Sequence, residues 1–155
     1  MLDELRELYQ EVILDHGRSP RNFRRLAEPA RHAHGQNPMC GDTLDVYLKL
    51  GADGTIEDVA FEGKGCAISM ASASLMTETL KGRQITEAER MFDAFHRLCT
   101  EESFDAATAG VDEDALERLQ VLAGVRAFPV RVKCATLAWH TMKAAIEGGA
   151  AVTTE

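Results

Sequence analysis

Two alternating segments in the first half of the chain most constrain its fold. Every second residue from 44 to 50 is leucine or valine, and a second extended run follows over residues 55–62. Residues 51–54 read Gly-Ala-Asp-Gly and supply a turn between the two runs. The pattern predicts an antiparallel β-hairpin.

This hairpin would gather reactive side chains at one end of its strands. Cys40 and Asp42 come just before the first strand, and Cys66 comes just after the second. Antiparallel pairing brings all three to the same end of the sheet. Cys134 lies far along the chain and would have to join them by folding. Together the four side chains are a candidate zinc site, because Zn²⁺ takes thiolate, imidazole or carboxylate donors in tetrahedral sites.

Glycines beside two of the cysteines favour this interpretation. Gly41 lets the backbone turn so that Cys40 and Asp42 can point at one ion. Cys66 precedes a run rich in alanine and serine that is typical of a helix, so its sulfur would sit beside free backbone N–H groups. That position favours the thiolate over the thiol.

Cys134 is flanked by positive charge instead. It is predicted to open a helix whose apolar positions share one face. Arg131 and Lys133 would lower the pKa of a thiol and offset the negative charge of three thiolates and a carboxylate. A single buried cysteine can also simply fill core space, and on the sequence alone Asp42 is equally well explained as a turn or N-cap residue.

Other cysteine and histidine residues are interpreted more simply. Cys99 lies in a helical pattern without glycine or charged neighbours and is predicted to fill the core. His32 and His34 share one face of a strand, a spacing compatible with metal, yet such a pair on a polar edge is interpreted as solvated. The remaining histidines are not preferred ligands: His16, His96 and His140.

The rest of the chain is predicted to be mostly helical, which gives an α+β protein: a small antiparallel sheet packed on several helices. An N-terminal helix should end near Gly17 and Pro20, and residues 30–35 could form an edge strand. With 155 residues and 45% hydrophobic content, the chain is expected to form one domain over residues 1–155. Further helices are expected over residues 66–80, 86–99, 112–122 and 132–147, with a flexible tail after about residue 148.

The net charge and the hydropathy of the chain limit the classes of partner that it can bind. A net charge of -8 speaks against nucleic acid or an anionic membrane surface, since both need basic patches. No apolar run approaches the length of a membrane span, and the start of the chain does not resemble a signal peptide. We therefore expect a cytoplasmic protein, where reduced cysteines favour metal binding or sulfur chemistry over disulfides.

Four segments resemble a known family. The strings HGQNPMCGD, GKGCAIS and RVKCATLAWH, with ILDHGRSPRNF near the start, resemble the IscU/NifU-N iron-sulfur assembly proteins, and the SufU branch in particular. Two features favour that branch. Lys133 stands where scaffold-type members typically carry a histidine ligand, and residues 82–125 form a longer segment than in those scaffolds, interpreted as a helical insertion. Arg24 is a departure, because relatives commonly have glycine there.

The resemblance implies a SufU/IscU-like fold and a zinc-dependent sulfur acceptor or relay rather than a stand-alone enzyme. The zinc ligands it implies are Cys40, Asp42, Cys66 and Cys134. A PLP-dependent, SufS-like cysteine desulfurase would present a persulfide, zinc would exchange Cys40 for a donor on that partner, and Cys40 would take the sulfur. The chain would thereby stimulate the turnover of the desulfurase. Arg131 would screen or position the sulfur-bearing thiolate. Downstream iron-sulfur assembly proteins would be further partners.

Two other functions remain open at this point. In the first, the same cysteines hold iron or a nascent iron-sulfur cluster, and the chain is a scaffold. In the second, zinc is purely structural and the chain is a protein-binding module without sulfur chemistry.

Overall fold

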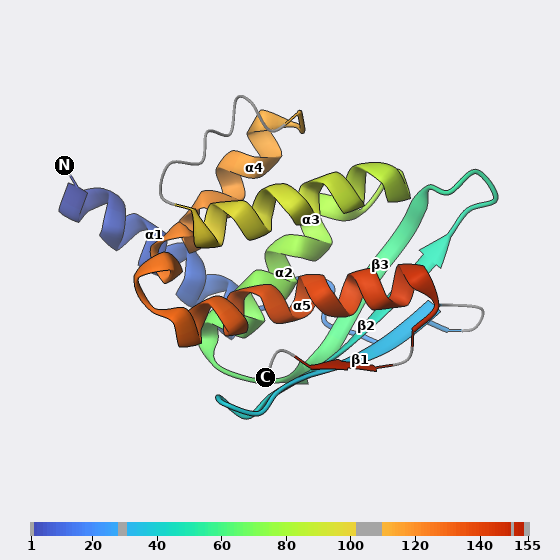
Figure 1. Cartoon of the computed structure of the whole chain (residues 1–155), viewed down its shortest axis with the longest axis horizontal. Helices are drawn as coiled ribbons and strands as arrows, with labels where there is room; N and C mark the ends of the chain where they lie inside the picture. The colour runs from blue at the N-terminus through green and yellow to red at the C-terminus, as the bar shows by residue number, and fades with distance from the viewer. Residues whose placement is uncertain (1, 28–30, 102–109, 150, 154–155) are drawn as a thin grey trace.

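A four-stranded sheet with helices over one of its faces forms the frame of the molecule (Figure 1). The computed structural model describes residues 2–27, 31–101, 110–149 and 151–153, with backbone alone for residues 2–8. The strands lie in the order β3-β2-β1-β4. Their bounds are Arg31–Asn37 (β1), Asp42–Leu50 (β2), Ile56–Lys64 (β3) and Ala151–Thr153 (β4). The predicted hairpin is confirmed as β2 and β3, which pair antiparallel.

β1 is not the edge strand that the sequence suggested. It lies between β2 and the short β4, which runs parallel to it. Gly148 ends the last helix in a left-handed conformation (φ 82°), which turns the chain back toward the sheet. Residues 151–153 therefore form a strand where a flexible tail was expected, and residues 150, 154 and 155 lie outside the described part of the chain.

The helices confirm the predicted α+β class, with two differences at their ends. The predicted helix over 112–122 stops at residue 119 and continues as a tighter 3-10 helix. The last helix begins at Pro129, earlier than predicted, because proline is favoured in the first turn, where its missing N–H costs nothing. The bounds are Leu2–Arg18 (α1), Ala67–Leu80 (α2), Ile85–Thr100 (α3), Glu113–Leu119 (α4), Gln120–Ala127 (η2) and Pro129–Glu147 (α5).

The core lies between the sheet and the helices. Trp139 of α5 is fully buried and stacks on Phe95 of α3 with ring centroids 4.7 Å apart. α5 packs closely on β1: a Cβ at Gly35 would lie 2.0 Å from the hydroxyl oxygen of Thr141, so only glycine fits there. Cys99 fills the core as predicted, and burial raises the pKa of its thiol to about 12.

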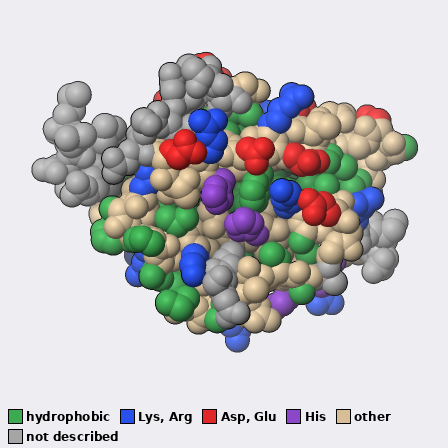
Figure 2. Space-filling view, in the orientation of Figure 1, with side chains coloured by type: hydrophobic (Ala, Val, Ile, Leu, Met, Phe, Trp, Pro, Cys, Tyr) green, Lys and Arg blue, Asp and Glu red, His purple; other side chains and the backbone are tan. Residues whose placement is uncertain are grey.

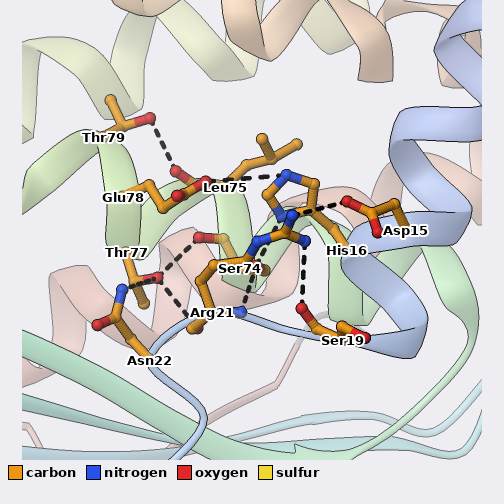
Figure 3. Close-up of polar contacts among 10 residues, drawn as sticks. All are labelled: Asp15, His16, Ser19, Arg21, Asn22, Ser74, Leu75, Thr77, Glu78 and Thr79. Atoms are coloured by element: carbon orange, nitrogen blue, oxygen red, sulfur yellow. Dashed lines mark hydrogen bonds and ion pairs between the residues drawn. The ribbon is translucent and has the colours of Figure 1, made fainter.

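A polar network ties α1 and the segment after it to α2 (Figure 3). His16, for which the sequence suggested no partner, is buried, and its Nδ1 lies 2.7 Å from the hydroxyl oxygen of Ser74. The backbone N–H of Arg21 donates to the same hydroxyl at 2.8 Å, and the Asn22 amide donates to Thr77 at 3.0 Å. These contacts fix the N-terminal helix against α2, which begins directly after Cys66.

We expect this network to weaken on acidification. Burial lowers the pKa of His16 below its usual 6.5, and the charge of Arg21 lowers it further, against the opposing effect of Glu78. The unfolded chain therefore binds a proton first as the pH falls. The stability that the buried, neutral His16 contributes is complete above a pH of about 6.5. It is lost as the pH falls below this value toward the lower pKa of His16 in the folded state.

Urea unfolding of the wild type and of His16→Gln between about pH 5 and pH 8 measures this effect. The wild type should lose more of its free energy of unfolding on acidification than the variant. The pKa of His140 is also lowered by burial, but that group is present in both proteins and cancels in the comparison. Parallel pH profiles would show that His16 does not cause the loss.

Candidate metal centre

Three segments meet at one end of the sheet, on the face covered by helices. The first is the turn between β1 and β2, which carries Cys40. Asp42 is the first residue of β2, paired with Asn37 of β1. Cys66 is the N-cap residue of α2, in an extended conformation, directly after β3. α5 contributes Cys134 from its second turn.

Ligand atoms of Cys40, Asp42 and Cys134 all lie within 4.8 Å of one another. The sulfur atoms of Cys40 and Cys134 are 3.1 Å apart, well beyond the roughly 2.0 Å of a disulfide bond, and both are free thiols. Cys134 is fully buried and Asp42 is 1% exposed, whereas Cys40 is half-buried. The centre thus has two buried donors and one that reaches the surface.

Cys66 lies beside this group rather than within it. Its backbone N–H donates to Asp42 Oδ1 at 2.9 Å. Its side chain hydrogen bonds with the thiol of Cys134, and its charge raises the pKa of that thiol. A Cβ at Gly65 would lie 2.6 Å from the same carboxylate oxygen, so this close approach of the chain to Asp42 depends on glycine. The structure therefore places all four residues singled out in the sequence at one end of the sheet.

Asn37 is a member of the centre that sequence reasoning missed. Its amide donates to Asp42 Oδ2 at 3.2 Å and to the Cys134 sulfur at 3.5 Å, so one buried side chain orients two donors. Its Oδ1 is buried without a hydrogen-bond partner among the described residues. The position before Pro38 in a turn was its only local signal, and a polar turn residue is ordinarily exposed.

The electrostatics favour a cation here. Burial raises the pKa of the Cys134 thiol, and its hydrogen bond with Cys40 and the charge of Cys66 raise it further. Arg131 is exposed, and its pKa is raised by the thiolates of Cys66 first and Cys134 second. Several thiolates and a carboxylate cannot share a buried site as anions without positive charge. Sulfur donors with one carboxylate suit Zn²⁺, a borderline-soft ion that takes both kinds of ligand.

The position of Cys134 corrects one expectation. It was predicted to open its helix, but α5 begins at Pro129, so Cys134 lies one turn further in. The free N–H groups of the helix start are therefore a turn away from its sulfur. Polar side chains of the centre interact with it instead, among them Asn37 and Arg131.

Apolar side chains are exposed next to Cys40 in the chain and around the start of α5. Met39 and Phe128 are each 63% exposed, and Val130 is 44% exposed. Figure 2 shows hydrophobic side chains at the surface over the start of α5. Beside them is a groove of about 430 Å³ with Phe128 and Arg131 in its lining, together with residues of α1, α2 and η2. Exposed aromatic and apolar groups of this kind are typical of protein-binding surfaces.

Within the part of the chain that the structure describes, none of the helices has the length and hydropathy to cross a membrane.

Comparison with known proteins shows the family to which the chain belongs. The family described as "NifU-like N terminal domain" matches residues 8–135. The zinc-dependent sulfurtransferase SufU of Bacillus subtilis is 39% identical over 145 residues, covering 92% of this chain and 93% of the relative. The iron-sulfur cluster assembly scaffold protein IscU of Streptococcus pyogenes is 37% identical, covering 96% of this chain and 89% of that protein.

A solved structure shares the fold. The crystal structure of a putative iron-sulfur cluster assembly scaffold protein for the SUF system from Fervidobacterium islandicum superposes with a TM-score of 0.73. It is 32% identical, and the match covers 86% of this chain and 92% of that one.

Proposed function

Because the chain belongs to the NifU-like N-terminal domain family, we propose that it accepts sulfur from a persulfide on a partner protein and relays it for iron-sulfur cluster assembly. The partner in this proposal is a PLP-dependent cysteine desulfurase, as the resemblance to the SufU branch implies. The relative from Bacillus subtilis, which is named a zinc-dependent sulfurtransferase, supports this choice.

The observation that carries the proposal is that Cys40 is both partly exposed and on a turn, unlike the other donors. Cys40 lies on a turn and reaches the surface, whereas Cys134 and Asp42 are buried behind it. Gly41 next to Cys40 adopts a positive φ of 71° and has open space around it. Cys66 is also partly exposed, but its backbone is fixed at the start of α2. Cys40 is thus the partly exposed thiol that can move toward a partner, and the other donors remain anchored by the fold.

The side chains of the centre are suitable ligands for zinc. The ion would be held by Cys40, Asp42, Cys66 and Cys134, and when bound it keeps the thiols deprotonated and offsets their charge. Asn37 keeps Asp42 and Cys134 in place through its two hydrogen bonds. Arg131 contributes a fixed positive charge at the rim beside the sulfur atoms.

The transfer itself is a thiolate exchange. The Cys40 sulfur attacks the terminal sulfur of the partner's persulfide, and a new S–S bond forms while the partner's S–S bond breaks. The electron pair of that bond leaves with the partner's cysteine as a thiolate. One thiolate replaces another and one persulfide replaces another, so the step needs neither an oxidant nor a reductant. In this proposal the positive charge of Arg131 stabilises the anionic sulfur that results.

A cluster scaffold is the second candidate, because relatives named as scaffolds match the chain over most of its length. Lys133 is an argument against the scaffold function. This residue precedes Cys134 at the place where the scaffold pattern carries a histidine ligand, and an ammonium group cannot replace an imidazole as a metal ligand while it is charged.

Persulfide trapping tests the proposal. The purified untagged protein is incubated with a cysteine desulfurase and cysteine, alkylated, digested and analysed by mass spectrometry. The Cys40 peptide should gain one sulfur atom, and the buried Cys99 peptide serves as an internal control that stays unmodified. Absence of persulfide from every cysteine would contradict the proposal. If anaerobic reconstitution with iron and sulfide then gave a transferable cluster, the scaffold function would replace it.

A further inference from the structure

Two thiols of the metal centre are in direct contact. The Cys134 thiol donates a hydrogen bond to the Cys40 sulfur at 3.1 Å, although the two residues are 94 positions apart in the chain. A disulfide bond holds its sulfur atoms at about 2.0 Å, so these two must approach each other by about 1 Å to form one. The folded chain thus holds two distant cysteines close to bonding distance.

The two cysteines differ in a way that is typical of redox-sensitive pairs. Cys40 is partly exposed on a turn, whereas Cys134 is fully buried in the second turn of α5. A dissolved oxidant therefore reaches Cys40 first, and Cys134 lies behind it as the resolving thiol. Gly41 has a positive φ of 71° and open space around it, so the turn can carry Cys40 the remaining distance while α5 stays in place.

We propose that a peroxide links Cys40 and Cys134 by a reversible disulfide bond, which expels the metal ion and switches off the centre. The inference rests on the proposed function, in which Cys40 is both a zinc ligand and the sulfur acceptor. The disulfide would remove two of the four ligands and the accepting thiol together. An oxidised chain would then accept no sulfur until a thiol reductant restored it.

Hydrogen peroxide supplies the oxidising power in two steps. The Cys40 thiolate attacks one peroxide oxygen, the O–O bond breaks and hydroxide leaves, which gives a sulfenic acid on Cys40. The Cys134 sulfur then attacks the Cys40 sulfur, an S–S bond forms, the S–O bond breaks, and the hydroxyl group leaves as water with the proton of the Cys134 thiol. The two cysteines together lose two electrons, and the peroxide gains them. The hydrogen bond between the two sulfur atoms already directs the Cys134 proton toward Cys40.

Cys66 is the competing partner for Cys134. It is partly exposed, and its side chain also hydrogen bonds with the Cys134 thiol. Its backbone is fixed, however, because it precedes α2 directly and its N–H donates to Asp42. Cys40 combines a sulfur in contact with Cys134 and a freer backbone, so the bond is expected between these two residues.

Oxidation of the untagged protein with its bound zinc tests the inference. The protein is freed of reductant, treated with a small excess of hydrogen peroxide, alkylated and digested without reduction, and the peptides are analysed by mass spectrometry. The Cys40 and Cys134 peptides should be joined with the loss of two hydrogen atoms. A chromogenic chelator should detect one zinc ion released for each crosslink formed. Dithiothreitol should restore both thiols and the capacity to bind zinc.

Variants of the other cysteines identify the partner. Cys99→Ala is the matched control, because it removes a buried thiol outside the centre and should leave the crosslink unchanged. Cys66→Ala should retain the crosslink as well. Cys134→Ser should lose it and accumulate a sulfenic acid on Cys40, which dimedone traps. Circular dichroism shows whether each variant is folded, and if Cys134→Ser is not, the mapping of the wild type still identifies the bonded pair.

Three results would overturn the inference: zinc release without the crosslink, a disulfide between Cys66 and Cys134 instead, or a protein in which peroxide changes neither cysteine. The mapping uses neither a desulfurase nor cysteine, so its outcome is separate from that of persulfide trapping. If Cys40 took sulfur but never formed the disulfide, the proposed function would stand and this inference would fail. A disulfide in a protein that takes no sulfur would leave the redox-sensitive pair and remove the proposed function.

Discussion

Replacement of Cys40 by alanine is expected to reduce sulfur transfer from the desulfurase by at least about a hundredfold, because it removes the attacking sulfur atom itself. The folded structure should survive, since Cys40 lies on a turn and contributes little to the core. Desulfurase turnover, measured as alanine and sulfide produced from cysteine, gives the effect on the partner, and persulfide trapping gives the effect on this chain.

Cys99→Ala is the matched control for that variant. It removes a thiol that is fully buried in the core and has a pKa of about 12, so it should lower stability modestly and leave sulfur transfer intact. If Cys40→Ala stimulated the desulfurase as well as the wild type does, the exposed thiol of this centre would not be the acceptor, and the proposed function would be wrong.

Asp42→Ala should be the most destabilising substitution at the centre. The carboxylate is buried and accepts hydrogen bonds from the Asn37 amide and from the Cys66 backbone N–H. Without it, the Asn37 amide keeps only its longer contact with the Cys134 sulfur, and the part-buried Cys66 N–H loses its acceptor. A lost hydrogen bond of this kind costs about 1 to 3 kcal/mol. The variant should also lose its metal, and the binding free energy of a metal adds to the stability of the fold.

Urea unfolding and elemental analysis of the purified variant measure the two losses together. Asp45→Ala is the control, because it removes a carboxylate from the exposed face of the same strand. It should retain one tightly bound zinc and most of the free energy of unfolding. Unfolding in the presence of a chelator separates the contributions: the difference between the wild type and Asp42→Ala should shrink to the lost hydrogen bonds. An Asp42→Ala protein with full zinc content and wild-type stability would remove Asp42 from the ligand set.

The local sequence pattern predicted the hairpin, and the hairpin placed three of the four expected ligands. The alternation over β2 and the extended apolar run over β3 are properties of adjacent residues, and antiparallel pairing then fixes where Cys40, Asp42 and Cys66 must lie. Cys134 comes close to these three residues only through tertiary packing. This approach requires α5 to pack tightly on β1, which the contact between Gly35 and Thr141 permits and which no local periodicity reveals.

Other features were beyond the sequence for different reasons. β4 has only three residues, so it is too short to show an alternating pattern, and its pairing depends on where α5 ends. Asn37 looks like any polar residue before a proline, and only the fold shows that it is buried between two metal-binding side chains. The start of α5 was placed too late because Pro129 was not recognised as the first residue of a helix.

The pairing of β4 with β1 bears on how this protein can be handled. If residues 151–153 were removed or displaced by a fused sequence, the main-chain amides and carbonyls of β1 along that side would lose their partners. An unpaired strand edge of this kind can pair with a strand from another molecule and promote aggregation. Purification tags are therefore better attached at the N-terminus, where they leave the pairing of β4 with β1 intact.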